Sequence, residues 1–232
     1  KQNMIMQLQR VVEYLDTLPV TVLSYDNIEA DDTIGYICRQ VLTESQITIM
    51  STDKDFLQLV DERIQVYSPT KKLMYDVDRI YNEYGIYPQN FLLYRILDGD
   101  KSDGIPGIKG AGIKTILKMF PWFGEPHKYT IEDMLKSATT KKDQYKLCES
   151  MVEQRDTIFL NRRLMDLDDG IISGSSKLKV QNITSQPIQR IIKHKFQRMF
   201  LEDKMYTALP NLTSWLATTF NRLNQMAEKS HG

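Results

Sequence analysis

The spacing of apolar and polar residues alternates between strand and helix periods in the first part of the chain. Apolar runs of strand length cover residues 20–25 and 46–51, and segments with helical spacing follow them at 28–42 and 56–59. The order strand, helix, strand, helix is typical of a sheet whose faces are covered by helices. We therefore predict an α/β fold with a mostly parallel central sheet and flanking helices.

A hairpin and further helices complete the predicted architecture. Residues 64–67 and 73–75 flank a Pro-Thr-Lys turn and predict the hairpin. Gly85 as a helix stop and Pro88 as a helix start separate two helices. A Gly/Ser-rich stretch at 168–176 predicts a mobile loop. The remaining predicted helices span residues 3–16, 77–84, 88–97, 131–138, 142–153, 156–164, 187–200 and 212–228. In the first of these, the side chains expected to face inward are Met4, Leu8, Val11, Val12 and Leu15.

Composition indicates an ordinary globular chain with local rather than global charge. Of the 232 residues, 41% are hydrophobic, and 30 basic residues balance 30 acidic ones. The charge is nevertheless segregated, because residues 104–118 carry three lysines and no acid, and local patches steer a polyanion. No apolar run is long enough to span a bilayer and no secretory signal is visible, so no membrane partner is expected. Two cysteines without a metal motif indicate a reducing compartment such as the cytoplasm.

One stretch combines the chemistry of a metal site with that of a phosphate site. Residues 98–103 are acidic, and residues 104–115 hold four glycines and two lysines before an apolar helical run begins. Carboxylates suit a divalent cation, and a glycine turn at a helix start suits an anion. A common glycine-rich surface turn would explain the stretch equally well if it stood alone.

Two acidic clusters upstream favour the metal interpretation. Asp53 and Asp55 follow a predicted strand, and another group opens the helix after the preceding strand. Helix capping accounts for single acids, at about 0.3–1 kcal/mol each. It accounts poorly for three clusters at strand ends and loops, because converging carboxylates repel one another unless cations or protons relieve them. Oxygen ligands without His or Cys select Mg²⁺ or Mn²⁺, and two such ions can hydrolyse a phosphodiester.

The motifs around these acids strongly resemble the 5′-nuclease family. The matching segments are Ile28-Glu29-Ala30-Asp31-Asp32, Ser51-Thr52-Asp53-Lys54-Asp55-Phe56 and Gly99-Asp100-Lys101-Ser102-Asp103-Gly104-Ile105-Pro106-Gly107. The family includes bacteriophage 5′-exonucleases, flap endonucleases and the 5′-nuclease domain of bacterial DNA polymerase I. The resemblance covers residues 28 to about 121 and weakens beyond them.

The resemblance implies a two-metal site. Glu29, Asp31 and Asp53 would help to hold the first Mg²⁺ or Mn²⁺ ion, and Asp32 would act nearby through water. The second ion would be held by Asp55, Asp100 and Asp103. The catalytic carboxylates would be Asp31, Asp53 and Asp55.

The resemblance also implies a helix-three-turn-helix that grips duplex DNA by backbone amides and lysines, with K⁺ held in its hairpin. The DNA-binding residues would be Gly107, Lys109, Gly110, Gly112, Lys114 and Thr115. The three predicted regions are then a partial α/β nuclease core at 1–98, a metal-binding loop with the helix-three-turn-helix at 99–121, and a helical C-terminal region at 122–232 packed on the core.

The family pattern begins upstream of Lys1, with two further acids and a helical arch, so we expect an N-terminal segment or a separate chain to complete the first metal site. The predicted function is structure-specific 5′-nuclease action on flaps, nicks or RNA primers in replication or repair, in a bacterial or phage-infected cell. Partners would be branched or nicked duplex DNA or an RNA–DNA hybrid. Two alternatives remain: a non-catalytic binder of such DNA, and a generic helix-hairpin-helix module, which explains the glycines but not the upstream acids.

Overall fold

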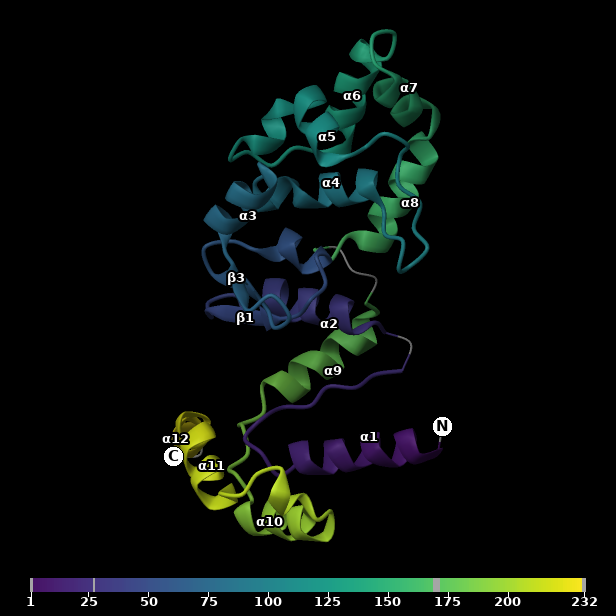
Figure 1. The fold of residues 1–232 in the computed structure, drawn as a ribbon. Coiled ribbons are helices and arrows are strands. Elements are labelled where there is room, and N and C mark those ends of the chain that lie inside the picture. Colours follow the sequence, from purple (N-terminus) through teal and green to yellow (C-terminus); the bar gives the residue numbers. More distant parts are fainter. Residues whose placement is uncertain (1, 27, 169–171, 231–232) are drawn as a thin grey trace. The chain divides into compact units, whose positions relative to one another are not determined.

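The computed structural model describes residues 2–26, 28–168 and 172–230 and divides the chain into two units (Figure 1). The larger unit is Ile28–Ile172, and the smaller unit combines Lys1–Asn27 with Ser173–Gly232. Each has a hydrophobic cluster of its own. The predicted boundaries after residues 98 and 121 both fall inside the larger unit.

The larger unit contains a small mixed sheet with the order β1 (Ile47–Met50), β2 (Ile64–Ser68), β3 (Leu73–Tyr75). β1 and β2 are parallel, with Ile47 opposite Ile64. β2 and β3 are antiparallel, with Val66 opposite Tyr75, so the predicted hairpin is confirmed. The sheet is mixed rather than mostly parallel.

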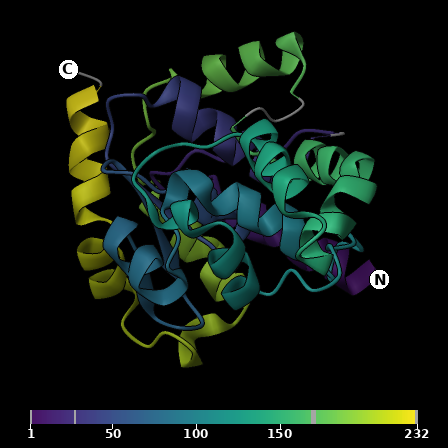
Figure 2. The same cartoon turned by 90° about the horizontal axis from the view of Figure 1, so that it is seen from above.

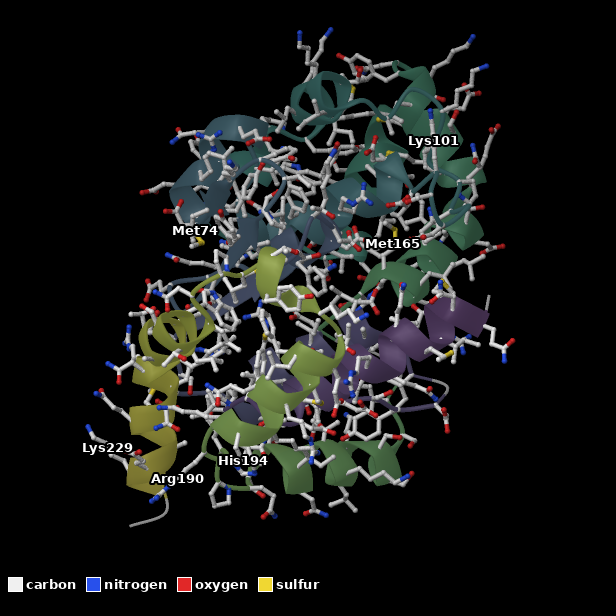
Figure 3. All side chains as sticks on the ribbon, turned by 60° about the horizontal axis from the view of Figure 1, so that its bottom comes forward. Met74, Lys101, Met165, Arg190, His194 and Lys229 are labelled. Carbon is white, nitrogen blue, oxygen red and sulfur yellow. The ribbon has the colours of Figure 1, made fainter. Side chains whose placement is uncertain are left out.

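Alternating burial explains how these strands pair. Along β2 every second residue is buried, and in β3 Tyr75 is buried while Met74, labelled in Figure 3, is 41% exposed. A strand with one buried face has its register set by this alternation.

The predicted strand at 20–25 is wrong. The segment has no regular secondary structure, and β1 at residue 47 is the first strand of the described chain. A strand needs a neighbour for its backbone hydrogen bonds, and apolar residues alone do not supply one.

Helices make up the rest of the larger unit. They are α2 (Ala30–Tyr36), η1 (Ile37–Val41), η2 (Asp55–Leu59), α3 (Val77–Tyr84), η3 (Pro88–Asn90), α4 (Phe91–Asp98), α5 (Ile113–Met119), η4 (Pro121–Gly124), α6 (Ile131–Lys141), α7 (Lys146–Glu153) and α8 (Arg155–Met165). α3 and α4 lie between the sheet and the layer of α5 to α7 (Figure 1). α6 packs on α7, and α8 packs on both α7 and α4, as Figure 2 shows from above.

Local sequence signals set several of these boundaries. Asp76 caps α3 by accepting from the N–H of Arg79 at 2.8 Å, and Gly85 ends it with a φ of 68°. At α6, Thr130 and Asp133 form a reciprocal capping box. The predicted stop at Gly85 and start at Pro88 are therefore confirmed.

Gly35 in α2 is expected to be intolerant of substitution, because a Cβ there would lie 2.4 Å from the backbone oxygen of Leu167. Gly35→Ala should cost about 2–3 kcal/mol of unfolding free energy, since backbone cannot move aside as a side chain can. Gly112→Ala is the control, because its Cβ meets open space. Thermal unfolding should show a lower Tm for the first variant only, and equal Tm values would contradict this packing.

The smaller unit is helical throughout its regular structure. It consists of α1 (Gln2–Leu15), α9 (Gly174–Thr184), α10 (Lys193–Glu202), η5 (Met205–Thr207), α11 (Leu212–Thr219) and α12 (Asn221–Ser230). The predicted helix at 187–200 begins only at Lys193, and two further predictions need correction here. The predicted helix at 212–228 breaks at Phe220, and the end of the predicted loop at 168–176 is instead the start of α9, because Ser173 caps it. Residues 169–171 of that loop lie outside the described residues.

The apolar stripe of α1 does not face inward as predicted. Met4, Leu8, Val11 and Val12 are 45–59% exposed, and only Leu15 reaches the cluster around Phe196. The helix is held at its other side, where Arg10 pairs with Glu13, Glu202 and Asp203. Among the described residues we find no helix with the length and apolar character needed to cross a membrane.

Candidate metal centre and nucleic-acid interface

Asp53 and Asp55 lie on the turn that follows β1. The Asp53 side chain accepts a hydrogen bond from the N–H of Asp55 at 2.8 Å. The next residues, Phe56 and Leu57, are buried and anchor the turn on the core. As a result Asp55 is only 9% exposed, while Asp53 remains at the surface.

A buried arginine joins this turn to the second acidic segment. Arg95 of α4 is 4% exposed. Its Nε donates to Asp55 at 2.5 Å, and its Nη2 donates to Asp100 at 2.7 Å. Its Nη1 donates to the carbonyl of Gly99 at 3.2 Å and lies 3.5 Å from a carboxylate oxygen of Asp98. Arg95 is not among the residues predicted from the sequence, although one basic residue inside the apolar run of α4 is a usable signal.

The loop that carries Asp100 closes tightly on itself. Asp100 and Ile105 exchange backbone hydrogen bonds of 2.9 and 2.7 Å. A Cβ on Gly107 would lie 2.1 Å from a carbonyl oxygen at the start of the loop, so glycine is required there. The buried Asn161 amide donates to carbonyls at both ends of the loop, at 2.9 and 2.8 Å. The position of Asp100 is therefore determined by backbone contacts as well as by Arg95.

A cavity of about 640 Å³ opens beside these acids. Its charged lining residues are Asp53, Asp98, Asp100, Asp103, Lys54, Arg95 and Lys101. All-carboxylate donors fit a hard divalent cation such as Mg²⁺. In the side-chain arrangement shown, however, no three His, Cys, Asp or Glu residues of the described chain are placed to hold a metal ion.

Two acids on the same guanidinium have opposite pKa shifts. Burial raises the pKa of Asp55 above its ordinary value, against the opposing hydrogen bond from Arg95. A hydrogen bond from the Ser102 hydroxyl lowers the pKa of Asp100, which is more exposed, and Arg95 lowers it further. Desolvation therefore disfavours the ionised form of Asp55, whereas Asp100 ionises readily.

The first acidic cluster stands at the N-terminus of α2. Glu29 occupies the cap position without a side-chain cap bond, and Asp31 accepts from the N–H of Asp32 at 2.9 Å. Burial and the charges of Asp31 and Glu29 raise the pKa of Asp32. α2 packs on η2, the element that contains Asp55, but no described contact joins the two sets of carboxylates directly.

The hairpin at residues 108–112 presents its backbone to open space. The N–H of Ala111 donates to the carbonyl of Ile108 at 3.0 Å, and both residues are buried anchors. Between them Gly110 has a φ of 89°, as a type II turn requires. Cβ atoms on Gly110 and Gly112 would meet nothing within 4 Å. A ligand can therefore approach the main chain here.

A groove of about 740 Å³ lies between this hairpin and the start of α7. Its basic lining residues are Lys109, Lys114, Lys118 and Lys146, and Glu149 is its one acid. None of these four lysines forms an ion pair with another residue of the described ranges. The groove therefore has positive charge free to attract an anion.

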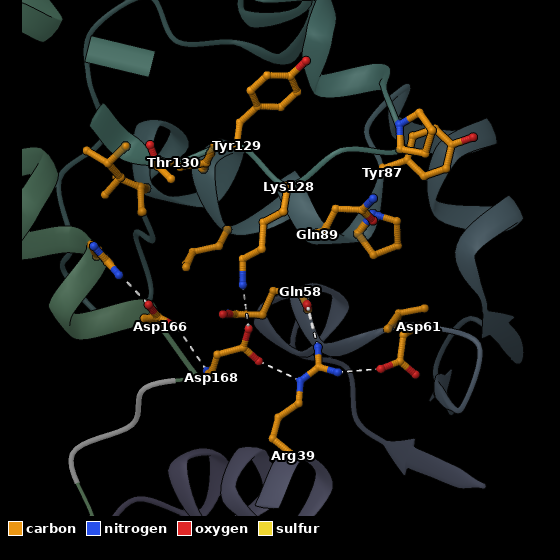
Figure 4. Close-up of a pocket in the computed structure, with 18 of the residues that line it drawn as sticks. Arg39, Gln58, Asp61, Tyr87, Gln89, Lys128, Tyr129, Thr130, Asp166 and Asp168 are labelled. Atoms are coloured by element: carbon orange, nitrogen blue, oxygen red, sulfur yellow. Dashed lines mark hydrogen bonds and ion pairs between the residues drawn. The ribbon is translucent and has the colours of Figure 1, made fainter. Parts of the chain in front are cut away.

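A further cavity of about 1000 Å³ lies elsewhere in the same unit (Figure 4). Its main charged groups pair with one another: Arg39 bonds Asp61 and Asp168, and Asp168 also contacts Lys128 at 3.4 Å. Gln58 accepts from Leu167 N–H and donates to the carbonyl of Met165, which Figure 3 labels. We assign this network to anchoring the chain after α8, because Arg39 and Lys128 are already paired with carboxylates.

Comparison with known proteins shows which family the chain resembles. Residues 1–85 match the family model described as the 5′-3′ exonuclease, N-terminal resolvase-like domain. The chain is 38% identical over 115 residues to a 5′-3′ exonuclease of Buchnera aphidicola, covering 49% of this chain and 40% of that protein. It is 33% identical over 132 residues to a 5′-3′ exonuclease of Aquifex aeolicus, covering 56% of this chain and 44% of that protein. Over residues 1–85 the chain resembles the 5′-nuclease family. It spans about two fifths of the length of these curated relatives.

Solved structures support the same fold for this 5′-nuclease relative. A bacteriophage T5 5′-exonuclease with bound zinc is similar with a TM-score of 0.54 and 20% identity, over 78% of this chain and 61% of that chain. A T5 flap endonuclease in complex with DNA and metal ions gives a TM-score of 0.53 at 20% identity, over 78% of this chain and 61% of that chain. At this identity the likeness concerns the fold.

The structure brings some of the predicted family ligands together and leaves others apart. Asp55 and Asp100 meet on Arg95, and Asp53 and Asp103 line the cavity beside them. The three acids at the start of α2, listed as Glu29, Asp31 and Asp32, form a separate group. Of the predicted DNA-binding residues, the structure places Lys109, Gly110, Lys114 and Thr115 along one groove, with Gly112 exposed next to them and Gly107 in the loop closure.

Proposed function

We propose that this chain provides the metal-binding and duplex-holding part of a structure-specific 5′-nuclease that hydrolyses phosphodiesters at 5′ ends, flaps or RNA primers. The observation that carries the proposal is the meeting of Asp55 and Asp100 on one buried guanidinium, beside a cavity lined by further carboxylates. Residues from distant parts of the chain are collected there although their charges repel, which is expected of a cation site rather than of a solvated surface.

The carboxylates divide into two ligand sets in this proposal. Asp55, Asp100 and Asp103 would hold one Mg²⁺ or Mn²⁺ ion. A second ion would be held by Glu29, Asp31 and Asp53, and Asp32 would act nearby through water. When bound, such ions supply an activated water and stabilise the leaving oxygen. The protein's own contribution is to orient the acids through Arg95, Ser102 and the closed loop.

The hairpin and its groove would hold the duplex next to the acids. Exposed backbone at Gly110 and Gly112 and the four free lysines suit phosphate oxygens, which carry no sequence information. The substrates would be branched or nicked duplex DNA or an RNA–DNA hybrid, and hairpin carbonyls would hold K⁺. A T5 relative has been solved as a complex with DNA and metal ions, which supports this choice.

A non-catalytic binder of branched or nicked DNA is the second candidate. It is favoured by the way Arg95 already neutralises part of the charge on Asp55 and Asp100. A binder needs the hairpin and the groove but not the acids.

Removal of the metal separates these candidates. The protein that carries this chain should cleave a 5′-labelled flap in Mg²⁺ or Mn²⁺ and should not cleave it in EDTA or in Ca²⁺, while binding it in all four conditions. Denaturing gels of the labelled strand and fluorescence anisotropy of the uncleaved complex provide the two measurements. Binding without cleavage in every metal would support the binder, and cleavage that persists in EDTA would exclude a metal-dependent site.

A further inference from the structure

Arg95 is the most deeply buried charge at the candidate metal centre, and it occupies the space between two proposed ligands of one ion. We propose that Arg95 is a built-in counter-cation, which holds Asp55 and Asp100 in place without metal and releases Asp100 when a divalent cation binds. The inference rests on the proposed function, because that function assigns both acids to the same ion.

The first observation is that all three guanidinium nitrogens are used. Nε donates to Asp55, Nη2 to Asp100 and Nη1 to the carbonyl of Gly99. A planar fork with three directed bonds has a fixed orientation, which a surface pair lacks. The pair between Arg79 and Glu83 illustrates the contrast, with a separation of 3.5 Å and an Arg79 side chain that is 45% exposed.

The second observation is that removal of Arg95 would leave uncompensated charge in a buried place. The side chains of Asp55 and Asp100 are 12% and 18% exposed, and that of Arg95 is 5% exposed. Breaking a buried ion pair by removing one partner is strongly destabilising, because the remaining charge has lost both water and its partner. Without metal, Arg95 is thus needed for the stability of the centre.

The third observation concerns Asp100, whose two carboxylate oxygens are both occupied. Oδ2 accepts from Arg95, and Oδ1 accepts from the backbone N–H of Ser102 at 2.8 Å and from the Ser102 hydroxyl. A divalent cation on Asp100 repels the guanidinium but not the Ser102 donors. Asp100 is also the more exposed of the two acids, so it can turn toward the cavity while Asp55 stays paired.

Thermal unfolding of Arg95→Gln with and without Ca²⁺ tests this role. In EDTA the variant should lose about 10 °C of Tm relative to wild type. Ca²⁺ at 10 mM should raise the Tm of the variant by at least about twice as much as that of wild type, because the ion replaces the missing charge and displaces nothing. Arg79→Gln, an exposed control in the same unit, should match wild type in both conditions. If Arg95→Gln fails to fold, Arg95→Lys should show both effects at intermediate size.

The double variant Arg95→Gln/Asp100→Asn connects the effect to Asp100. In EDTA it should be more stable than Arg95→Gln alone, because one uncompensated charge is gone. A variant Tm in EDTA within 2 °C of wild type, or additive effects of the two substitutions, would overturn the counter-cation role. Equal Ca²⁺ shifts in wild type and Arg95→Gln would overturn the release of Asp100. If Ca²⁺ stabilises neither protein, the metal site of the proposed function fails, while the double variant in EDTA still decides the counter-cation role.

Discussion

Asp100→Asn is expected to slow flap cleavage by about 100-fold or more while leaving duplex affinity within about twofold of wild type. Asn keeps the shape of the side chain but loses the charge that a hard cation requires. A loss of about 3 kcal/mol in transition-state stabilisation corresponds to a factor of about 100 in rate. Duplex affinity should be retained because the hairpin and its groove lie outside the acidic cavity. Single-turnover cleavage in Mg²⁺ and anisotropy in Ca²⁺ measure the two quantities on the same flap.

Asp98→Asn is the matched control for this prediction. Asp98 lines the same cavity, but its side chain is 39% exposed and lies 3.5 Å from Arg95. It also accepts from the Tyr94 hydroxyl at 3.1 Å, an interaction that Asn retains through its own oxygen. Cleavage should change less than about threefold, which is within about 0.7 kcal/mol. Equal losses for both variants, or parallel losses of cleavage and affinity in Asp100→Asn, would argue against a specific ligand role.

Changes along the hairpin groove should weaken duplex binding for every sequence alike. Lys114→Ala and Lys146→Ala should each flatten the dependence of log K on log salt by about 0.9, the value for one phosphate contact on B-DNA. Gly112→Ala should weaken binding about tenfold, because its methyl group meets open space in the protein but obstructs a phosphate at the backbone. Salt titrations in Ca²⁺ with two unrelated duplexes measure affinity, slope and sequence dependence together.

Lys142→Ala is the control for charge alone, since Lys142 is an exposed lysine that does not line the groove. Its salt slope should stay at the wild-type value. If Lys142→Ala and Lys114→Ala flatten the salt slope equally, the effect comes from the net charge of the protein, and the groove does not bind phosphate specifically. If Gly112→Ala affects one duplex only, the hairpin reads sequence and is not a backbone clamp.

The features that could be predicted from sequence are those with local causes. The turn between β2 and β3, the stop at Gly85 and the start at Pro88 each depend on residues within one turn of themselves. The proximity of Asp53 to Asp55 is local in the same way. The hairpin at Gly110 also has a local cause, because a residue with positive φ is needed there.

The features that could not be predicted depend on distant partners. The apolar residues at 20–25 match a strand, but a strand requires a neighbouring strand, and the described residues place none beside this segment. The apolar stripe of α1 has the spacing of a buried helix face. The helix is nevertheless held through its polar side, where Arg10 pairs with Glu202 and Asp203. Arg95 is the clearest case at the site, because its partners Asp55 and Asp100 are brought to it only by the fold.

A crystal structure with Mn²⁺ tests most directly whether Asp55 and Asp100 belong to a divalent cation site. The anomalous difference map should show a peak at coordination distance from carboxylate oxygens of both acids, beside the cavity lined by Asp103. In that structure Arg95 should have separated from Asp100 and kept its bond to Asp55. A map without a peak at saturating Mn²⁺, with Arg95 still bonded to both carboxylates as in Mn²⁺-free protein, would contradict the account.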